Sequence, residues 1–202
     1  MPFSLGLGLL IALVAGNSQA DCDCLWEGTF TEVQHQTQLV ISATVLGSKG
    51  NSIDVHINRR LRGQHHAQTA RVWLKTANYC RPEVTEFPID SQWVLALYRI
   101  KEDVPGGFNP NTPNVSYGRV GDYYLSSCGG YWLSQHEGRV AGNLVNAPRW
   151  VREPKMTPVL VDLVADFISG RVDVSTLVKA SKEDPALREL KLNTRAFLRE
   201  EQ

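Results

Sequence analysis

The sequence has no excess of either charge and, beyond residue 20, no long run of apolar residues. It contains 21 lysines and arginines and 21 aspartates and glutamates. Proteins that bind nucleic acids or anionic membranes need a basic face, so this balance argues against a nucleic-acid partner. A membrane-spanning helix takes about 20 consecutive apolar residues. We therefore expect no integral membrane segment after residue 20.

Common catalytic motifs are also missing. The sequence contains no Gly-x-Ser-x-Gly, no His-Glu-x-x-His and no phosphate-binding loop. Ser126, Ser127 and His136 could contribute to a catalytic set, but almost any chain of this size offers such residues. We therefore expect a protein that is not an enzyme, with no catalytic residues and no cofactor.

The first 20 residues have the form of a secretory signal peptide. Residues 5–16 are an apolar run that is too short to span a membrane. Ser18 and Ala20 are small residues at the two positions that a signal peptidase reads. This pattern predicts cleavage after Ala20 and a mature chain that begins at Asp21. We expect the mature protein to be secreted or periplasmic.

All four cysteines follow the predicted cleavage site. An even number of cysteines in an oxidising compartment indicates two disulfides. A bond between Cys22 and Cys24 would close a strained small ring, so each of them is expected to pair with Cys80 or Cys128, in either combination. Two such bonds would pin the N-terminal segment to the body of the protein.

Residues 21–150 have the pattern of a mostly β domain. Thr29 and Glu32 have the spacing of a capping box, which predicts a short helix through about His35. Segments rich in β-branched and aromatic residues, separated by Gly and Pro, predict strands at 38–46, 52–58, 70–76, 92–100, 122–127 and 130–134. The first two are expected to form a hairpin. Five or six short strands indicate a small barrel or sandwich.

The composition changes near residues 148–158, and residues 151–202 have helical patterns. Thr157 and Pro158 form a helix start and Gly170 a stop, and the residues between them place five apolar side chains on one face: Leu160, Leu163, Val164, Phe167 and Ile168. A second pattern begins at Asp184-Pro185 and continues through Leu187, Leu190 and Phe197. We expect a helical C-terminal extension whose apolar faces pack on the β domain.

The order of these features resembles the netrin-like module of the tissue inhibitors of metalloproteinases. The resemblance covers residues 22–142 and consists of a Cys-x-Cys start, a short helix, the strand QLVISATVL, a strand followed by RRLRG, and the segments WLKTANYC, WVLALY and SSCGGYW. It implies an OB-type barrel in which Cys22 pairs with Cys80 and Cys24 pairs with Cys128. We therefore expect a five- to six-stranded OB-like barrel with two disulfides and a C-terminal helical extension.

Inhibitors of this family chelate a protease zinc through the α-amine and carbonyl of their first cysteine, which is residue one of the mature chain. Here Asp21 precedes Cys22, and Asp23 occupies the position that would enter the specificity pocket of the protease. The third cysteine pair that the family has in this domain has no counterpart. We expect the fold to be shared and the inhibitory mechanism to transfer poorly.

The first functional hypothesis is protein binding through the pinned N-terminus. The candidate contact residues are Asp21, Cys22, Asp23, Cys24 and Trp26. The expected partner is a protein, with a peptidase such as a metalloprotease as one candidate.

The alternative hypothesis is the handling of copper or zinc. Cys22 and Cys24 would bind the metal together with His65 and His66, because thiolate and imidazole ligands suit both metals. The competing interpretation of the two histidines is a solvated polar loop beside oxidised cysteines.

Four further features allow both a functional and a structural interpretation. Asn114 begins an N-glycosylation sequon in a long loop. Arg59, Arg60 and Arg62 form either a basic cluster or a solvated strand end. The glycines of SCGGYW either line a binding surface or relieve crowding at a barrel corner. An exposed subset of the aromatic residues would form a platform for a ligand or partner: Trp73, Trp93, Tyr98, Tyr123, Tyr124, Tyr131 and Trp132.

Overall fold

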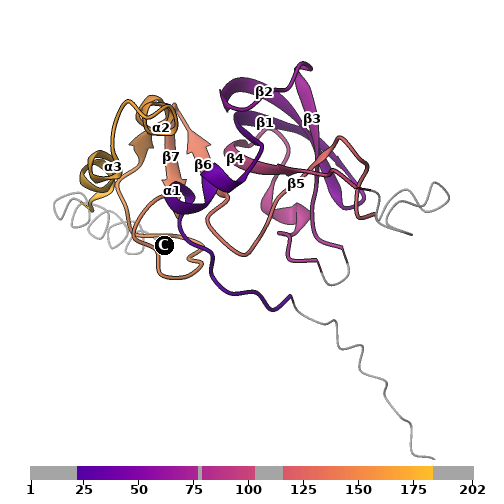
Figure 1. The fold of residues 1–202 in the computed structure, drawn as a ribbon, viewed down its shortest axis with the longest axis horizontal. Coiled ribbons are helices and arrows are strands. Elements are labelled where there is room, and N and C mark those ends of the chain that lie inside the picture. The colour runs from indigo at the N-terminus through magenta and orange to yellow at the C-terminus, as the bar shows by residue number, and fades with distance from the viewer. Residues whose placement is uncertain (1–21, 77–78, 103–115, 184–202) are drawn as a thin grey trace, which may run out of the picture.

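The computed structural model describes residues 22–76, 79–102 and 116–183, and strands dominate these residues (Figure 1). The strands are β1 Leu39–Lys49, β2 Ser52–Arg62, β3 Thr69–Trp73, β4 Gln92–Arg99, β5 Tyr123–Tyr124, β6 Trp132–His136, β7 Arg139–Gly142 and β8 Val159–Leu160. The helical elements are α1 Phe30–Val33, η1 Gln34–Gln36, η2 Val84–Glu86, α2 Val161–Ile168 and α3 Val174–Ser181. The expected mostly β fold is confirmed.

Five strands close into a barrel in the order β1-β2-β3-β5-β4, and pairing between β4 and β1 completes the ring. Strand β4 is the branch point, because Val94 pairs with Ser42 of β1 on one side and with Leu133 of β6 on the other. Strands β6, β7 and β8 continue from β4 as an extension of the sheet. The predicted barrel is therefore confirmed, and of the three strands that extend it only β6 falls in a predicted segment.

The hairpin of β1 and β2 follows the predicted pattern. Ile53 and Val55 are buried, whereas Asp54 and His56 alternate with them and are partly exposed. Residues 39–43 of β1 are all buried because this half of the strand pairs with both β2 and β4. Three register shifts interrupt the pairing of β1 with β2. Such bulges bend a strand and increase its twist, as closure of a small barrel requires.

Helix α1 begins at the predicted position. The carboxylate of Glu32 accepts hydrogen bonds from the backbone N–H of Thr29 at 2.7 Å and from its hydroxyl at 2.7 Å. The first of these bonds satisfies a backbone donor that a helix start leaves without an intrahelical partner. The hydrogen bonds from Thr29 lower the pKa of Glu32 below its ordinary value.

We expect Glu32→Gln to lower the free energy of unfolding at neutral pH by well under about 1 kcal/mol, because the side chain is exposed. Glutamine keeps an acceptor oxygen but lacks the charge. Since the folded-state pKa of Glu32 is lowered, the stabilisation by the charged group is fully present above the unfolded pKa and is lost as the pH falls through the folded pKa. Urea unfolding near pH 7 and near pH 3 measures the difference. An equal difference at both pH values would contradict this assignment.

The start of the first C-terminal helix was predicted wrongly. Val159 and Leu160 do not continue a helix from Pro158 but form β8, which pairs with Val140 and Arg139 of β7. Helix α2 begins only at Val161, and the side chain of Leu160 is 51% exposed instead of lying on the apolar face. The physical reason is that the open edge of β7 supplies hydrogen-bond partners for extended backbone, which local helical periodicity does not reveal.

The other features of the C-terminal segment agree in part with prediction. Gly170, at a φ of 75°, follows the end of α2 as expected. Val164 of α2 and Leu177 of α3 are fully buried in the same apolar cluster as the barrel strands, so these helices do pack on the sheet. Helix α3 was not predicted, and the sequence signal for it is Asp173, whose carboxylate accepts from the backbone N–H of Thr176 at 3.1 Å. The predicted helix from Asp184 lies outside the described residues.

Candidate functional site

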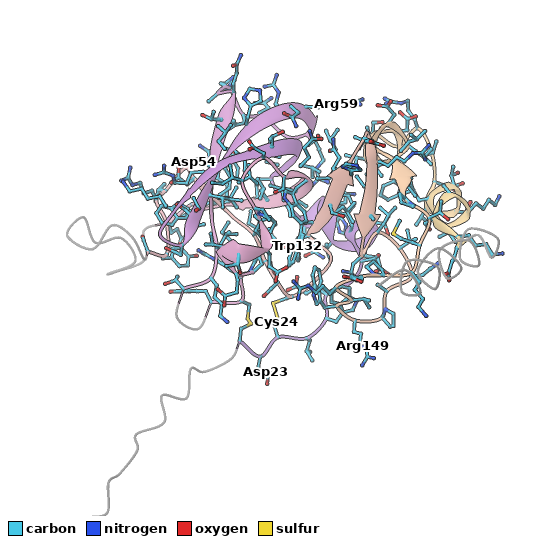
Figure 2. All side chains as sticks on the ribbon, turned by 180° about the vertical axis from the view of Figure 1, so that it is seen from behind. Asp23, Cys24, Asp54, Arg59, Trp132 and Arg149 are labelled. Atoms are coloured by element: carbon cyan, nitrogen blue, oxygen red, sulfur yellow. A yellow bond between two sulfur atoms is a disulfide. The ribbon has the colours of Figure 1, made fainter. Side chains whose placement is uncertain are left out.

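Residues 22–28, here called the N-terminal strap, cross one end of the barrel without forming a helix or strand. In Figure 2, Asp23 and Cys24 lie at the opposite end of the molecule from Asp54 and Arg59. Disulfides join Cys22 to Cys80 and Cys24 to Cys128, with Cα–Cα distances of 5.1 and 5.7 Å. This is the pairing that the family resemblance implies, and none of the four cysteines is free. The strap is thus tied to the barrel at two positions separated by a single residue.

Hydrogen bonds hold the end of the strap in addition to the disulfides. The backbone N–H of Glu27 donates to the carbonyl of Cys128 at 2.8 Å, and that of Gly130 donates to the carbonyl of Gly28 at 2.9 Å. The indole N–H of Trp26 donates to the carbonyl of Ala147 at 2.9 Å. Disulfides at Cys22 and Cys24 hold the first half of the strap, and hydrogen bonds at residues 26, 27 and 28 hold the second half.

Gly130, in the SCGGYW motif, lets the chain pass close to the backbone of Phe30 and Asn143. A Cβ atom on Gly130 would lie 2.7 Å from the backbone N of Phe30 and 2.7 Å from the carbonyl O of Asn143. These two atoms form a hydrogen bond of 2.8 Å that joins α1 to the segment after β7. Glycine is required here to relieve crowding, which is the structural interpretation of the motif.

The exposed residues of the strap are Asp23, Cys24, Leu25 and Glu27, and Leu25 is 89% exposed. Trp26 is partly buried, and its ring centroid lies 6.5 Å from that of Trp150. Trp150 packs at 4.3 Å on the buried ring of Trp132 but remains 38% exposed. We call Leu25 and Trp26 of the strap, together with Trp150 beside Trp26, the strap face. Figure 2 shows Arg149 at the same end of the molecule, with its side chain directed into solvent.

Two tyrosine hydroxyl groups are linked by hydrogen bonds to the strap residue Glu27. The hydroxyl of Tyr131 donates to the carboxylate of Glu27, and the hydroxyl of Tyr98 lies 2.8 Å from that of Tyr131. Burial, together with the hydrogen bond to Glu27, raises the pKa of Tyr131 far above its ordinary value. The phenol therefore stays protonated and serves as a permanent donor to Glu27.

A buried arginine lies next to the first disulfide. Arg81 is 4% exposed, and its guanidinium carbon lies 4.4, 4.6 and 5.3 Å from the ring centroids of Tyr117, Tyr124 and Tyr79. It also donates to the carbonyl of Tyr117 at 2.6 Å. Desolvation lowers its pKa, and the three ring faces stabilise the charge. No local sequence pattern marks this cluster, because its tyrosines come from separate segments of the chain.

The structure does not place His65 and His66 together with the cysteines. The ring nitrogens of His65 lie 3.1 Å from the hydroxyl of Tyr123 and 2.9 Å from the carbonyl of Thr69, while His66 is exposed. Among the described residues, the only group of three or more potential metal ligands that lie close together consists of the four cysteines. The predicted combination of two cysteines and two histidines is therefore not assembled.

The three arginines in the second half of β2 each have a partner within the protein. Arg59 forms an ion pair with Asp162 of α2, and Arg60 donates to the carbonyl of His65 at 2.6 Å. Arg62 donates to the side-chain oxygen of Gln34 at 2.6 Å and to the carbonyl of Thr37 at 3.0 Å. The structural interpretation of this cluster therefore holds.

The remaining sequence candidates have structural surroundings or lie outside the structure. All seven aromatic residues proposed as a platform are buried or partly buried. The exposed large aromatic side chains among the described residues are Tyr79 and Trp150. Ser126 accepts a hydrogen bond from the backbone N–H of Cys128 at 3.2 Å, and His136 is exposed beside Glu137. Asn114 lies outside the described residues.

Within the described part of the chain, no helix has the length and apolarity needed to cross a membrane. Comparisons with protein-family models, with curated proteins and with solved structures found no significant match to this chain.

Proposed function

We propose that the protein is an exported, non-catalytic binding module that holds a protein partner through the strap face. The observation that carries this proposal is Leu25, an apolar side chain that is 89% exposed on a segment fixed by two disulfides. Binding usually costs the ordering of flexible contact residues, and a segment that is already fixed avoids most of this cost.

The neighbours of Leu25 also support a protein as the ligand. Trp150 adds a partly exposed ring beside Trp26, and tryptophan is enriched among the residues that dominate protein interfaces. Arg149 and Asp23 supply charges of both signs at the same end of the molecule. An apolar centre with charged groups around it is the usual composition of a protein interface.

A zinc metalloprotease is the first partner class to test, because the order of motifs and the disulfide pairing resemble those of the metalloproteinase inhibitors. Asp21, which precedes the first cysteine, would prevent that cysteine from presenting a free α-amine to zinc. Two purified forms, one beginning at Asp21 and one at Cys22, separate binding by the strap face from zinc chelation. Binding by both forms with inhibition only by the second would show that the interface is present without the chelating group.

We expect Leu25→Ser to weaken the partner complex at least about tenfold, because it removes the most exposed apolar side chain of the strap face. Thermal unfolding should be nearly unchanged, since the side chain is exposed. Proteins captured from the native compartment by the wild type would be identified, purified and titrated by calorimetry against both forms.

The matched control is Leu46→Ser, at a leucine of β1 whose side chain is 52% exposed. It should leave partner binding unchanged. A partner that binds the wild type and Leu25→Ser with equal affinity would exclude the strap face as its binding site.

A further inference from the structure

Four sulfur atoms gather where the strap meets the barrel. The Sγ atoms of Cys22, Cys24, Cys80 and Cys128 all lie within 4.8 Å of one another, although they come from three separate segments. Cys22 and Cys24 are not bonded to each other, yet their Sγ atoms are 3.7 Å apart. Two disulfides can form without lying this close to each other, so the disulfides alone do not explain why the four sulfur atoms are clustered.

The cluster has nearly the size of a tetrahedral site for zinc. Zinc bonds thiolate sulfur at about 2.3 Å, which places the four sulfurs of a tetrahedron about 3.8 Å apart. The Sγ atoms of Cys22 and Cys24 already have this separation. The sulfurs of each disulfide would have to move apart to reach it after reduction.

Contacts other than the disulfides hold the cysteine backbones near one another. The backbone N–H of Ser127 donates to the carbonyl of Cys80 at 2.9 Å, which connects the segments that carry Cys80 and Cys128. The bond from Glu27 to the carbonyl of Cys128, at 2.8 Å, connects the strap to the same place. Cys24 is exposed, so a reductant and a metal ion can reach the cluster from solvent.

We propose that the reduced protein binds one zinc ion through the thiolates of Cys22, Cys24, Cys80 and Cys128. Two equivalents of a dithiol reductant would transfer four electrons and four protons to the two disulfides, and the reductant would become two cyclic disulfides. The four resulting thiols would then lose their protons to solvent as four Zn–S bonds form. The ion would join the same three segments that the disulfides join in the oxidised protein.

This site differs from the metal site that the sequence suggested. It uses all four cysteines and neither histidine, because His65 is engaged with Tyr123 and Thr69. It also gives the strap a second means of attachment. The strap would be held by disulfides under oxidising conditions and by zinc under reducing conditions.

The test uses the purified protein, reduced anaerobically with a phosphine so that no added thiol competes for metal. Zinc is titrated against a chelating dye, and cobalt(II) serves as a spectroscopic probe of ligand type. We expect one equivalent of zinc, a cobalt spectrum of the tetrahedral all-thiolate type, and no binding to the oxidised protein. The absence of zinc binding after complete reduction, or a stoichiometry other than one, would overturn the proposal.

Variants decide which ligands are used. Loss of a residue that only hydrogen-bonds to a metal ligand weakens metal binding by up to about 100-fold. Cys24→Ser removes a ligand itself, so it should weaken zinc binding by more than about 100-fold. The double variant His65→Ala/His66→Ala should bind zinc like the wild type. Equal affinity after Cys24→Ser would exclude the four-thiolate site, and loss of binding in the histidine variant would favour the ligand set suggested by the sequence.

A folded site must also be distinguished from four thiols on an unfolded chain. The reduced protein in urea should bind zinc at least about tenfold more weakly than in buffer, and equal affinity would overturn the proposal. If reduction alone unfolds the protein, circular dichroism before and after addition of zinc provides the decision. Recovery of the native spectrum with one equivalent supports the site, and failure to recover it contradicts the site.

Discussion

Replacing Cys24 and Cys128 together by serine is expected to lower the free energy of unfolding by about 2–5 kcal/mol, the usual cost of removing a native disulfide from a small domain. The bond joins residues separated by 104 positions, so its removal greatly increases the conformational freedom of the unfolded chain. Replacing both cysteines avoids leaving a free thiol that could form new disulfides. Urea unfolding without reductant measures the loss.

The double variant Cys22→Ser/Cys80→Ser is the matched comparison. Its bond spans 58 positions, so loop-closure entropy predicts a loss smaller by about 0.5 kcal/mol. Adding a reductant should destabilise the wild type and have a smaller effect on each variant, because each variant has one disulfide left to lose. If reductant leaves the wild-type unfolding curve unchanged, the strap is not held covalently in the protein.

Gly130→Ala is expected to lower the free energy of unfolding by about 3 kcal/mol, at the upper end of the usual cost of overpacking. The new methyl group would lie 2.7 Å from two backbone atoms, the N of Phe30 and the O of Asn143. These atoms belong to a helix start and a strand end and cannot rotate away as a flexible side chain would. Thermal or urea unfolding of the variant measures the effect.

Gly47→Ala provides the control, because a Cβ atom on Gly47 of β1 would meet no atom within 4 Å. We expect a change within about 0.5 kcal/mol, as for surface substitutions in general. The contrast separates the clash at Gly130 from a general effect of replacing glycine in the sheet. Similar losses in both variants would show that the close contact between α1 and residue 143 is not tight.

Local patterns in the sequence were sufficient for much of the barrel. Alternation of Ile53 and Val55 with Asp54 and His56 predicts a half-buried strand because successive side chains of a strand point to opposite faces. Thr29 and Glu32 predict a helix start because the carboxylate can reach a backbone donor three residues away. These features depend on near neighbours, so the sequence reveals them.

The disulfide pairing could be predicted from the sequence only in part. Spacing alone disfavours a bond between Cys22 and Cys24 but leaves two pairings open, and the structure shows which of the two forms. Cys80 follows β3 and Cys128 follows β5, and these strands pair in parallel, which brings both cysteines to the same end of the barrel. Strand pairing thus brings both distant cysteines within reach of the strap.

The sequence by itself determined the segments of β1 to β6, the first helix and the presence of two disulfides, because hydrophobic alternation, capping and cysteine chemistry act over short distances or through residue identity. Only the tertiary structure decided that residues 159–160 join β7, that three tyrosines surround Arg81, and that four sulfur atoms share one small volume. Each of these depends on chain segments that are distant in sequence and meet only when the barrel closes. The sequence gives the identity of each of these residues, but the whole fold decides which residues surround it.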